Sequence, residues 1–218
     1  MTAWISRATG LTQAEMKNNA NIVIATYRAM GYNDKTIAGI LGNMQNESSV
    51  NPELVEAGGG GGYGLVQWTP KSVLINHCAA LGLSPYTSGD VQLQVIDAEL
   101  QKVSKVNEWY TTQGFINPYK PSGATNDMVG ITAEQFKSNS MNWAPDKLAL
   151  MFMVGYERPS YDPDTNHIAR RKADALTWYD YMGGVIPPQP PTPPQPQPGG
   201  SGKSLITLWI CKALTGGI

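Results

Sequence analysis

Residues 42–70 read GNMQNESSVNPELVEAGGGGGYGLVQWTP. The apolar positions just before and within this stretch recur at helical spacing: Ile37, Ile40, Leu41 and Met44. Glu47 continues that spacing, so at about 3.6 residues per turn its carboxylate extends the apolar stripe of the same helix. The pattern predicts a helix from Asn33 or Asp34 to about Glu47, with an acidic side chain on its inward face.

The residues after this helix favour an irregular segment. Residues 51–63 contain Pro52, several acidic side chains and an unbroken glycine run over 58–62. A glycine in a helix interior costs about 1 kcal/mol relative to alanine, so no helix continues through the run. We therefore expect a loop or a small β-hairpin after the helix that carries Glu47.

Capping residues and apolar periodicity predict helices in most of the remaining chain. One begins at Thr12, which forms a capping-box pattern with Glu15, and another begins at Thr69-Pro70 and ends at Gly82. Later helices are expected over residues 90–109, 132–138, 145–157 and 167–182. The predicted fold class is mainly α, of an α+β type with one small β element.

Composition divides the chain of 218 residues into three parts. Residues 1–184 have the mixture of apolar and charged residues typical of a globular domain. Residues 185–203 hold a proline-glutamine tract that favours extended polyproline II, so we expect a linker there. Residues 204–218 are apolar and are expected to dock on another protein. Contact with a membrane surface is the alternative, because the segment is shorter than the roughly 20 residues that cross a bilayer.

Several classes of ligand are excluded by charge and residue inventory. The net charge of −1 argues against a nucleic-acid partner. The two cysteines and two histidines do not have the short paired spacing that a four-ligand zinc site needs, and no metal or cofactor is expected. The adjacent His77 and Cys78 predict a packed helix face. The N-terminus lacks an apolar run behind a basic start, so we expect no signal peptide.

Glu47 has the predicted environment of a general acid. Partial desolvation disfavours its ionised form, and the negative end of the helix dipole acts in the same direction. A carboxyl that keeps its proton near neutral pH can protonate a glycosidic oxygen as the bond to the sugar breaks. A glutamate that merely extends from the helix end into solvent is the alternative.

Three motifs in fixed order carry a family resemblance: Glu47-Ser48, Asn51-Pro52 and Gly64-Leu65-Val66-Gln67. Together they resemble the lysozyme-like superfamily of goose-type lysozymes, lytic transglycosylases and, most of all, tail lysozymes of bacteriophages that infect Gram-positive hosts. In the phage branch the similarity extends to residues 42–45, 67–70 and 156–159. The resemblance covers about residues 12–182.

This resemblance implies that Glu47 is the catalytic acid. It also implies a saccharide cleft lined by Ser48, Tyr63, Gln67, Trp68 and Tyr156. The amide of Gln67 can donate to and accept from sugar hydroxyls, while aromatic rings offer flat faces for sugar rings. Tyr156 is equally consistent with a core position. Glu157 is a further candidate contact, with an ion pair to Arg158 as the alternative.

A second catalytic carboxylate is not determined by the motifs. Glu53 and Glu56 lie in the loop after the catalytic helix, and Glu56 is nearer the turn that is expected to fold over the cleft. Solvated loop charges are the alternative for both. Some members of the superfamily use the acetamide of the substrate instead, or form a 1,6-anhydro product without water.

The implied function is cleavage of the β-1,4 bond between N-acetylmuramic acid and N-acetylglucosamine in peptidoglycan. The enzyme would belong to a phage tail and act on the host wall from outside, with the glycan strands and other tail proteins as partners, the latter through residues 204–218. Three alternatives remain: a lytic transglycosylase, a non-catalytic glycan-binding module of the tail, and an enzyme released at lysis.

Overall fold

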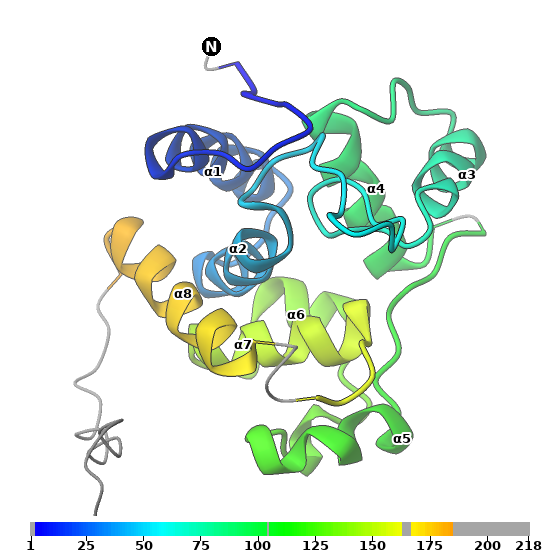
Figure 1. Ribbon diagram of the computed structural model, residues 1–218. Coiled ribbons are helices and arrows are strands. Elements are labelled where there is room, and N and C mark those ends of the chain that lie inside the picture. The colour runs from blue at the N-terminus through cyan, green and yellow to red at the C-terminus, as the bar shows by residue number, and fades with distance from the viewer. Residues whose placement is uncertain (1–2, 104, 163–166, 185–218) are drawn as a thin grey trace, which may run out of the picture. The chain divides into compact units, whose positions relative to one another are not determined.

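A computed structural model describes residues 3–103, 105–162 and 167–184 (Figure 1). The predicted linker and the apolar segment over residues 204–218 lie outside this part of the chain. The described part is mainly helical, as predicted. Its elements are α1 Gln13–Ala29, α2 Asp34–Ser48, α3 Ser72–Leu81, α4 Gly89–Gln101, α5 Gln113–Ile116, η1 Asn117–Ser122, η2 Asn126–Met128, α6 Ala133–Ser138, α7 Pro145–Phe152, η3 Met153–Glu157 and α8 Ile168–Tyr181. Within it, no helix combines the length and apolar character that crossing a membrane requires.

The helix boundaries follow local capping where capping groups exist. Thr12 and Glu15 form the predicted capping box of α1. The predicted start of α3 at Thr69-Pro70 is wrong: the helix begins at Ser72, and the Thr69 hydroxyl donates to the Gln67 carbonyl at 2.9 Å. The prediction of a helix to Trp109 is also wrong, because α4 ends where Lys102 adopts a left-handed φ of 58°.

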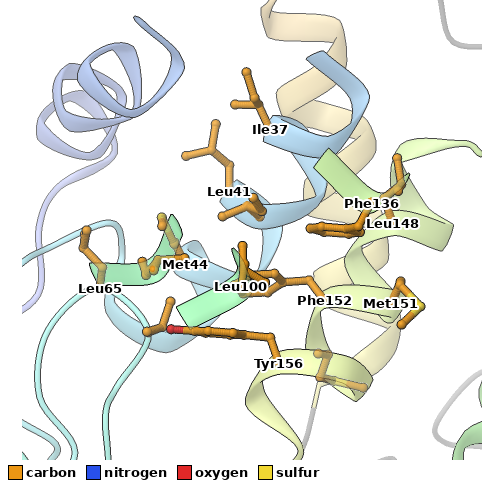
Figure 2. Packing of buried hydrophobic residues seen from close by; sticks show 14 of the residues in the cluster. Ile37, Leu41, Met44, Leu65, Leu100, Phe136, Leu148, Met151, Phe152 and Tyr156 are labelled. Atoms are coloured by element: carbon orange, nitrogen blue, oxygen red, sulfur yellow. The ribbon is translucent and has the colours of Figure 1, made fainter. Parts of the chain in front are cut away.

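Helix α2 lies at the centre of the packing and contacts α1, α7 and α8 (Figure 1). Figure 2 shows Leu41 and Met44 of α2 in the same buried cluster as Leu148 and Phe152 of α7. All four side chains are fully buried. Removing such a side chain from water stabilises the fold by about 1.5–3 kcal/mol, so the helix that carries Glu47 is held by apolar packing along its length.

Two glycines let the neighbouring helices approach the backbone of α2. A Cβ atom added at Gly42 would lie 2.6 Å from the carbonyl oxygen of Arg171 and 2.8 Å from the amide nitrogen of Ala175, both in α8. One added at Gly39 would lie 2.9 Å from the amide nitrogen of Ala149 in α7. These distances are shorter than van der Waals contact, so glycine is required for the observed approach.

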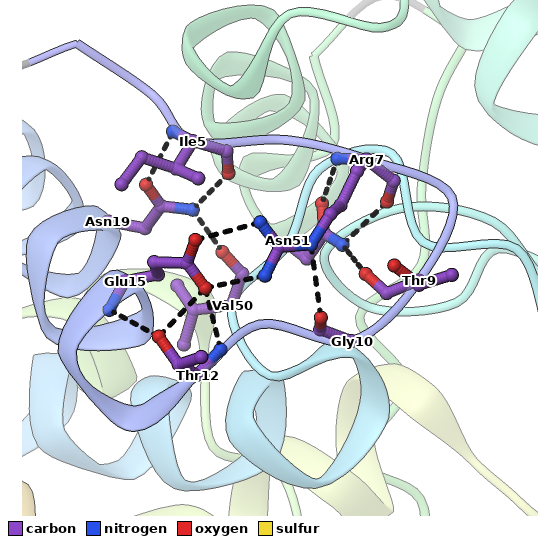
Figure 3. A network of polar contacts seen from close by, with 9 residues as sticks. All are labelled: Ile5, Arg7, Thr9, Gly10, Thr12, Glu15, Asn19, Val50 and Asn51. Carbon is purple, nitrogen blue, oxygen red and sulfur yellow. Dashed lines mark hydrogen bonds and ion pairs between the residues drawn. The ribbon is translucent and has the colours of Figure 1, made fainter.

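The N-terminal arm over residues 3–11 is held by two buried asparagines (Figure 3). The Asn19 amide of α1 donates to the carbonyls of Ile5 and Val50, at 2.7 and 2.9 Å. The Asn51 amide donates to those of Arg7 and Thr9, at 2.7 and 2.8 Å. Asn51 of the Asn-Pro motif therefore ties the arm to the segment that follows α2.

The segment between α2 and α3 is a loop, which is one of the two forms predicted for it; the hairpin form is not confirmed. It contains two isolated antiparallel bridges, Val55 with Tyr63 and Tyr63 with Trp68, and residues 64–67 form the turn inside the second. The side chain of Gln92 in α4 makes two hydrogen bonds to the backbone of this loop. Its Oε1 accepts from the Leu65 amide at 2.9 Å, and its Nε2 donates to the Pro52 carbonyl at 2.7 Å.

We expect Gly42→Ala to lower the free energy of unfolding by about 1–3 kcal/mol, because the added methyl group meets backbone atoms of α8. Alanine gains about 1 kcal/mol in helix propensity, so a net loss requires steric conflict. Urea unfolding measures the difference. Gly114→Ala in α5 is the control, because the nearest atom to its added Cβ is Thr112 Oγ1 at 3.8 Å. Equal stability of Gly42→Ala and wild type would contradict this reading of the α2–α8 contact.

Candidate active site

A pocket of about 320 Å³ lies beside the C-terminal end of α2. Its lining comes from segments that are distant in the sequence: α2, the loop before α3, Val73 of α3, Glu108 after α4, and the η3 turn with the residues after it. Five of the predicted site residues line it, namely Glu47, Gln67, Trp68, Tyr156 and Glu157. Tertiary packing thus brings the Glu-Ser, Gln-Trp and Tyr-Glu-Arg-Pro motifs to one cavity.

Behind the pocket, the buried guanidinium of Arg171 in α8 joins the two predicted carboxylates. Its Nη2 contacts Glu47 Oε1, and its Nη1 lies 2.7 Å from Glu157 Oε2. The same Nη1 donates to Asn43 Oδ1 of α2 at 2.8 Å. Arg171 is 6% exposed. A buried charge requires partners of this kind, so the three side chains hold α2, α8 and η3 in one arrangement.

Sequence reasoning missed Arg171, although α8 carries a signal for it. The buried residues of this helix are Ile168, Arg171, Ala175 and Trp178, which recur at helical spacing. A charged residue on an otherwise apolar helix face indicates a buried partner of opposite charge. The pattern identifies the charge, but only the fold shows that its partners are Glu47 and Glu157. The alternative ion pair between Glu157 and Arg158 is not formed, because Glu157 pairs with Arg171 and Arg158 pairs with Glu108.

The surroundings of the Glu157 carboxyl favour its protonated form. Burial raises its pKa to about 8; the charge of Arg171 opposes this shift and the negative charge of Glu47 adds to it. Its Oε1 is buried and has no hydrogen-bond partner among the described residues. The site therefore combines a carboxylate bound to arginine with a neighbouring protonated carboxyl.

The aromatic walls of the pocket are also part of the core. Trp68 and Tyr156 are 6% and 5% exposed, and the Tyr156 ring stacks on Phe152 with 4.6 Å between centroids. Their polar atoms point into the protein, where Trp68 Nε1 donates to Glu99 Oε1 at 3.0 Å and the Tyr156 hydroxyl donates to Glu99 Oε2. Trp68 and Tyr156 are thus core residues and pocket-lining residues at the same time.

Gln67 is held by the loop that it belongs to. Its backbone has a left-handed φ of 52°, and its Nε2 donates to the carbonyls of Leu54 and Gly64, at 3.2 and 3.0 Å. Both amide hydrogens are engaged in this way. The carbonyl oxygen of the side chain makes no hydrogen bond to the described residues, so it is the atom that can accept from a sugar.

Ser48, Tyr63 and Glu56 do not line the pocket. The Ser48 hydroxyl is buried, donates to the Leu65 carbonyl at 2.9 Å and accepts from the Asn51 amide at 3.2 Å. Tyr63 is buried in the loop, and this burial raises the pKa of its hydroxyl to about 12. Glu56 is exposed and accepts from the Gly62 amide at 2.9 Å. These three side chains shape the loop that frames the pocket.

Six residues of the pocket lining were not predicted as site residues: Val66, Thr69, Val73, Glu108, Arg158 and Pro159. Glu108 lines the pocket, and its carboxylate pairs with Arg158 Nη2. The Arg158 guanidinium lies over the Tyr110 ring, 4.7 Å from its centroid. Glu108 follows α4, in the part of the chain that was predicted to be helical, and no local pattern marked it. Among the described residues, no group of three or more His, Cys, Asp or Glu is placed to hold a metal ion.

Comparison with known proteins identifies the family of the chain. The sequence model of a family described as phage tail lysozyme matches residues 18–182. The chain is also 30% identical over 178 residues to morphogenesis protein 1 of Bacillus phage B103, in an alignment that covers 80% of this chain and 42% of that protein. The chain thus spans about two fifths of the length of this relative. On the match over residues 18–182, the chain belongs to the phage tail lysozyme family.

Proposed function

We propose that residues 1–184 form a domain that cleaves the glycan strands of peptidoglycan at the bond between N-acetylmuramic acid and N-acetylglucosamine, with Glu47 as general acid. The observation that carries the proposal is that Glu47 and Glu157 share Arg171 at the wall of a pocket, where burial raises the pKa of Glu157. Membership of the phage tail lysozyme family supports a lytic enzyme of the cell wall.

In this proposal, the proton that the leaving group receives comes from the carboxyl pair of Glu47 and Glu157. Glu47, Glu157 and Arg171 together carry one transferable proton below about pH 8, because Glu157 is still protonated there. A transfer of this proton from Glu157 to Glu47 leaves the net charge of the three groups unchanged. Glu47 then donates it to the glycosidic oxygen as positive charge develops on the sugar ring.

The other pocket residues bind the sugar. Gln67 accepts a hydrogen bond from a hydroxyl or acetamide group through its side-chain oxygen, and the edges of Trp68 and Tyr156 give apolar contact with a pyranose ring. Ser48 and Tyr63 contribute through the shape of the loop.

One observation favours a lytic transglycosylase as a second candidate. A hydrolase needs a carboxylate that activates water or attacks the sugar. Of the other carboxyls that line the pocket, Glu108 is paired with Arg158 and Glu157 is protonated. Glu56 lies outside the lining. Attack by a hydroxyl of the substrate itself needs no such group and gives a 1,6-anhydro product. Mass spectrometry of digested muropeptides separates the two reactions by this end group.

We further propose that the domain reaches the host wall as part of the virion. The relative in Bacillus phage B103 bears the name morphogenesis protein. In this proposal residues 185–203 act as a spacer, and residues 204–218 dock on other tail proteins. Deletion of residues 204–218 should leave an active enzyme that is absent from purified particles. Leakage of liposomes by the full chain alone would favour membrane contact instead.

We expect Glu47→Gln to lower the rate of wall clearing by about 10²–10⁴-fold, because the amide has no proton to give. Its fold and its binding to insoluble cell walls should be retained, which circular dichroism and co-sedimentation measure. The matched control is Glu134→Gln on the exposed first turn of α6, which should clear walls like the wild type. Clearing by Glu47→Gln at the wild-type rate would refute the acid assignment.

The activity should fall as pH rises through about 8. The pKa of Glu157 is raised in the folded protein, so the pair keeps its proton below about pH 8 and loses it above. We expect Glu157→Gln to lower kcat at neutral pH and to remove this alkaline limb from the profile of kcat against pH, because glutamine neither supplies the proton nor titrates. An unchanged limb in Glu157→Gln would show that another group supplies the proton.

A further inference from the structure

The carboxylate of Glu99 in α4 is fully buried and joins three elements. It accepts from Trp68 Nε1 in the loop before α3 at 3.0 Å and from the Tyr156 hydroxyl in η3. His77 Nδ1 of α3 lies 2.5 Å from the same carboxylate. An ionised group with no exposed surface is stable only when such partners surround it. Both of its aromatic partners line the pocket, whereas Glu99 itself does not.

The positions of Trp68 and Tyr156 depend on this carboxylate. Trp68 belongs to a loop that has only isolated bridges, and Tyr156 belongs to a π-helical turn after α7. Neither segment is joined to the other by a strand or helix. Hydrogen bonds to a charged acceptor are stronger than those between neutral groups, so Glu99 fixes the distance between the two walls.

His77 supplies the counter-charge. Within the described part of the chain, the ion pair of Glu99 is the one with His77, which is partly exposed. The hydrogen bond that His77 Nδ1 donates to Glu99 raises the pKa of His77, and the charge of Glu108 contributes in the same direction. The other titratable groups that act on this cluster are Cys78 in α3 and Tyr27 in α1. Neither of these can supply positive charge.

We propose that Glu99 is a positioning residue, which holds Trp68 and Tyr156 in the wall of the pocket while His77 balances its charge, so that deprotonation of His77 weakens saccharide binding. This inference rests on the proposed function for its ligand. Below the raised pKa of His77, the pair of Glu99 and protonated His77 has no net charge, and Trp68 and Tyr156 keep their positions. Above that pKa the buried carboxylate has no counter-charge, and movement of the loop toward water relieves the cost.

A spectroscopic test needs no activity. The indole N–H resonance of Trp68, assigned in ¹⁵N spectra by its loss in Trp68→Phe, should shift with pH as His77 titrates. In His77→Gln the side-chain amide can still donate to Glu99 but cannot titrate, so the shift should vanish. The link between the two residues would be overturned if the chemical shift of the Trp68 indole did not change with pH in the wild type. It would also be overturned if this shift changed equally in His77→Gln.

A kinetic test separates positioning from stability. Glu99→Gln should raise KM for peptidoglycan roughly tenfold with a smaller change in kcat, because a hydrogen bond to a buried charge is lost. The wild-type KM should rise with pH, and in His77→Gln it should not. The matched control is Asp97→Asn in the same helix: Asp97 binds the Tyr32 hydroxyl at 2.7 Å and Lys137 at 3.3 Å, and neither partner lines the pocket.

The outcomes are distinct. Loss of thermal stability in both Glu99→Gln and Asp97→Asn, with KM unchanged in each, would reduce Glu99 to a structural role and overturn the proposal. A wild-type protein that cleaves no peptidoglycan would refute the proposed function, and the Trp68 titration would still decide the link to His77. If Glu99→Gln does not fold, His77→Gln provides the comparison on its own.

Discussion

The guanidinium of Arg171 joins the helix that carries Glu47 to the turn that carries Glu157. This contact places a full positive charge in the interior, where it is stable only because Asn43 and two carboxyls surround it. It also requires α8 to lie against the backbone of α2, which Gly42 permits. The rest of the site depends on this contact, because the pocket is bounded by α2 and by the η3 turn that Arg171 holds beside it.

The arrangement explains how a carboxyl keeps a proton next to a carboxylate. Two negative charges beside a single guanidinium would leave one buried charge without a partner. Burial of Glu157 and the charge of Glu47 therefore favour the protonated form of Glu157. The raised pKa of Glu157 thus depends on the packing of α2, η3 and α8, since these elements supply Glu47, Glu157 and Arg171.

A second buried network organises the opposite side of the pocket. Glu99 of α4 receives donors from the loop, from α3 and from η3, and Gln92 of the same helix holds the loop at two further points. Much of the motif pattern around Glu47 has this kind of role. Ser48 and Asn51 are buried and bind backbone groups, so two of the three motifs that resemble the family include residues that build the frame around the acid.

The sequence by itself determined the local elements and singled out Glu47, which lines the pocket. Helical periodicity and capping residues predicted α1, α2 and α6, because a capping box and an apolar stripe act within a few residues of one another. The end of α4, the start of α3 and the short helices α5, η1 and η2 escaped prediction, because no such signal marks them.

Only the tertiary structure decided which polar groups meet. The partners of Arg171 and of Glu99 come from segments far apart in the chain, and no local spacing relates them. The same holds for the proton on Glu157, since burial and a neighbouring charge arise from packing. Helix formation is a short-range property of the chain, whereas the protonation and pairing of buried carboxyls depend on which surfaces the folded chain brings together.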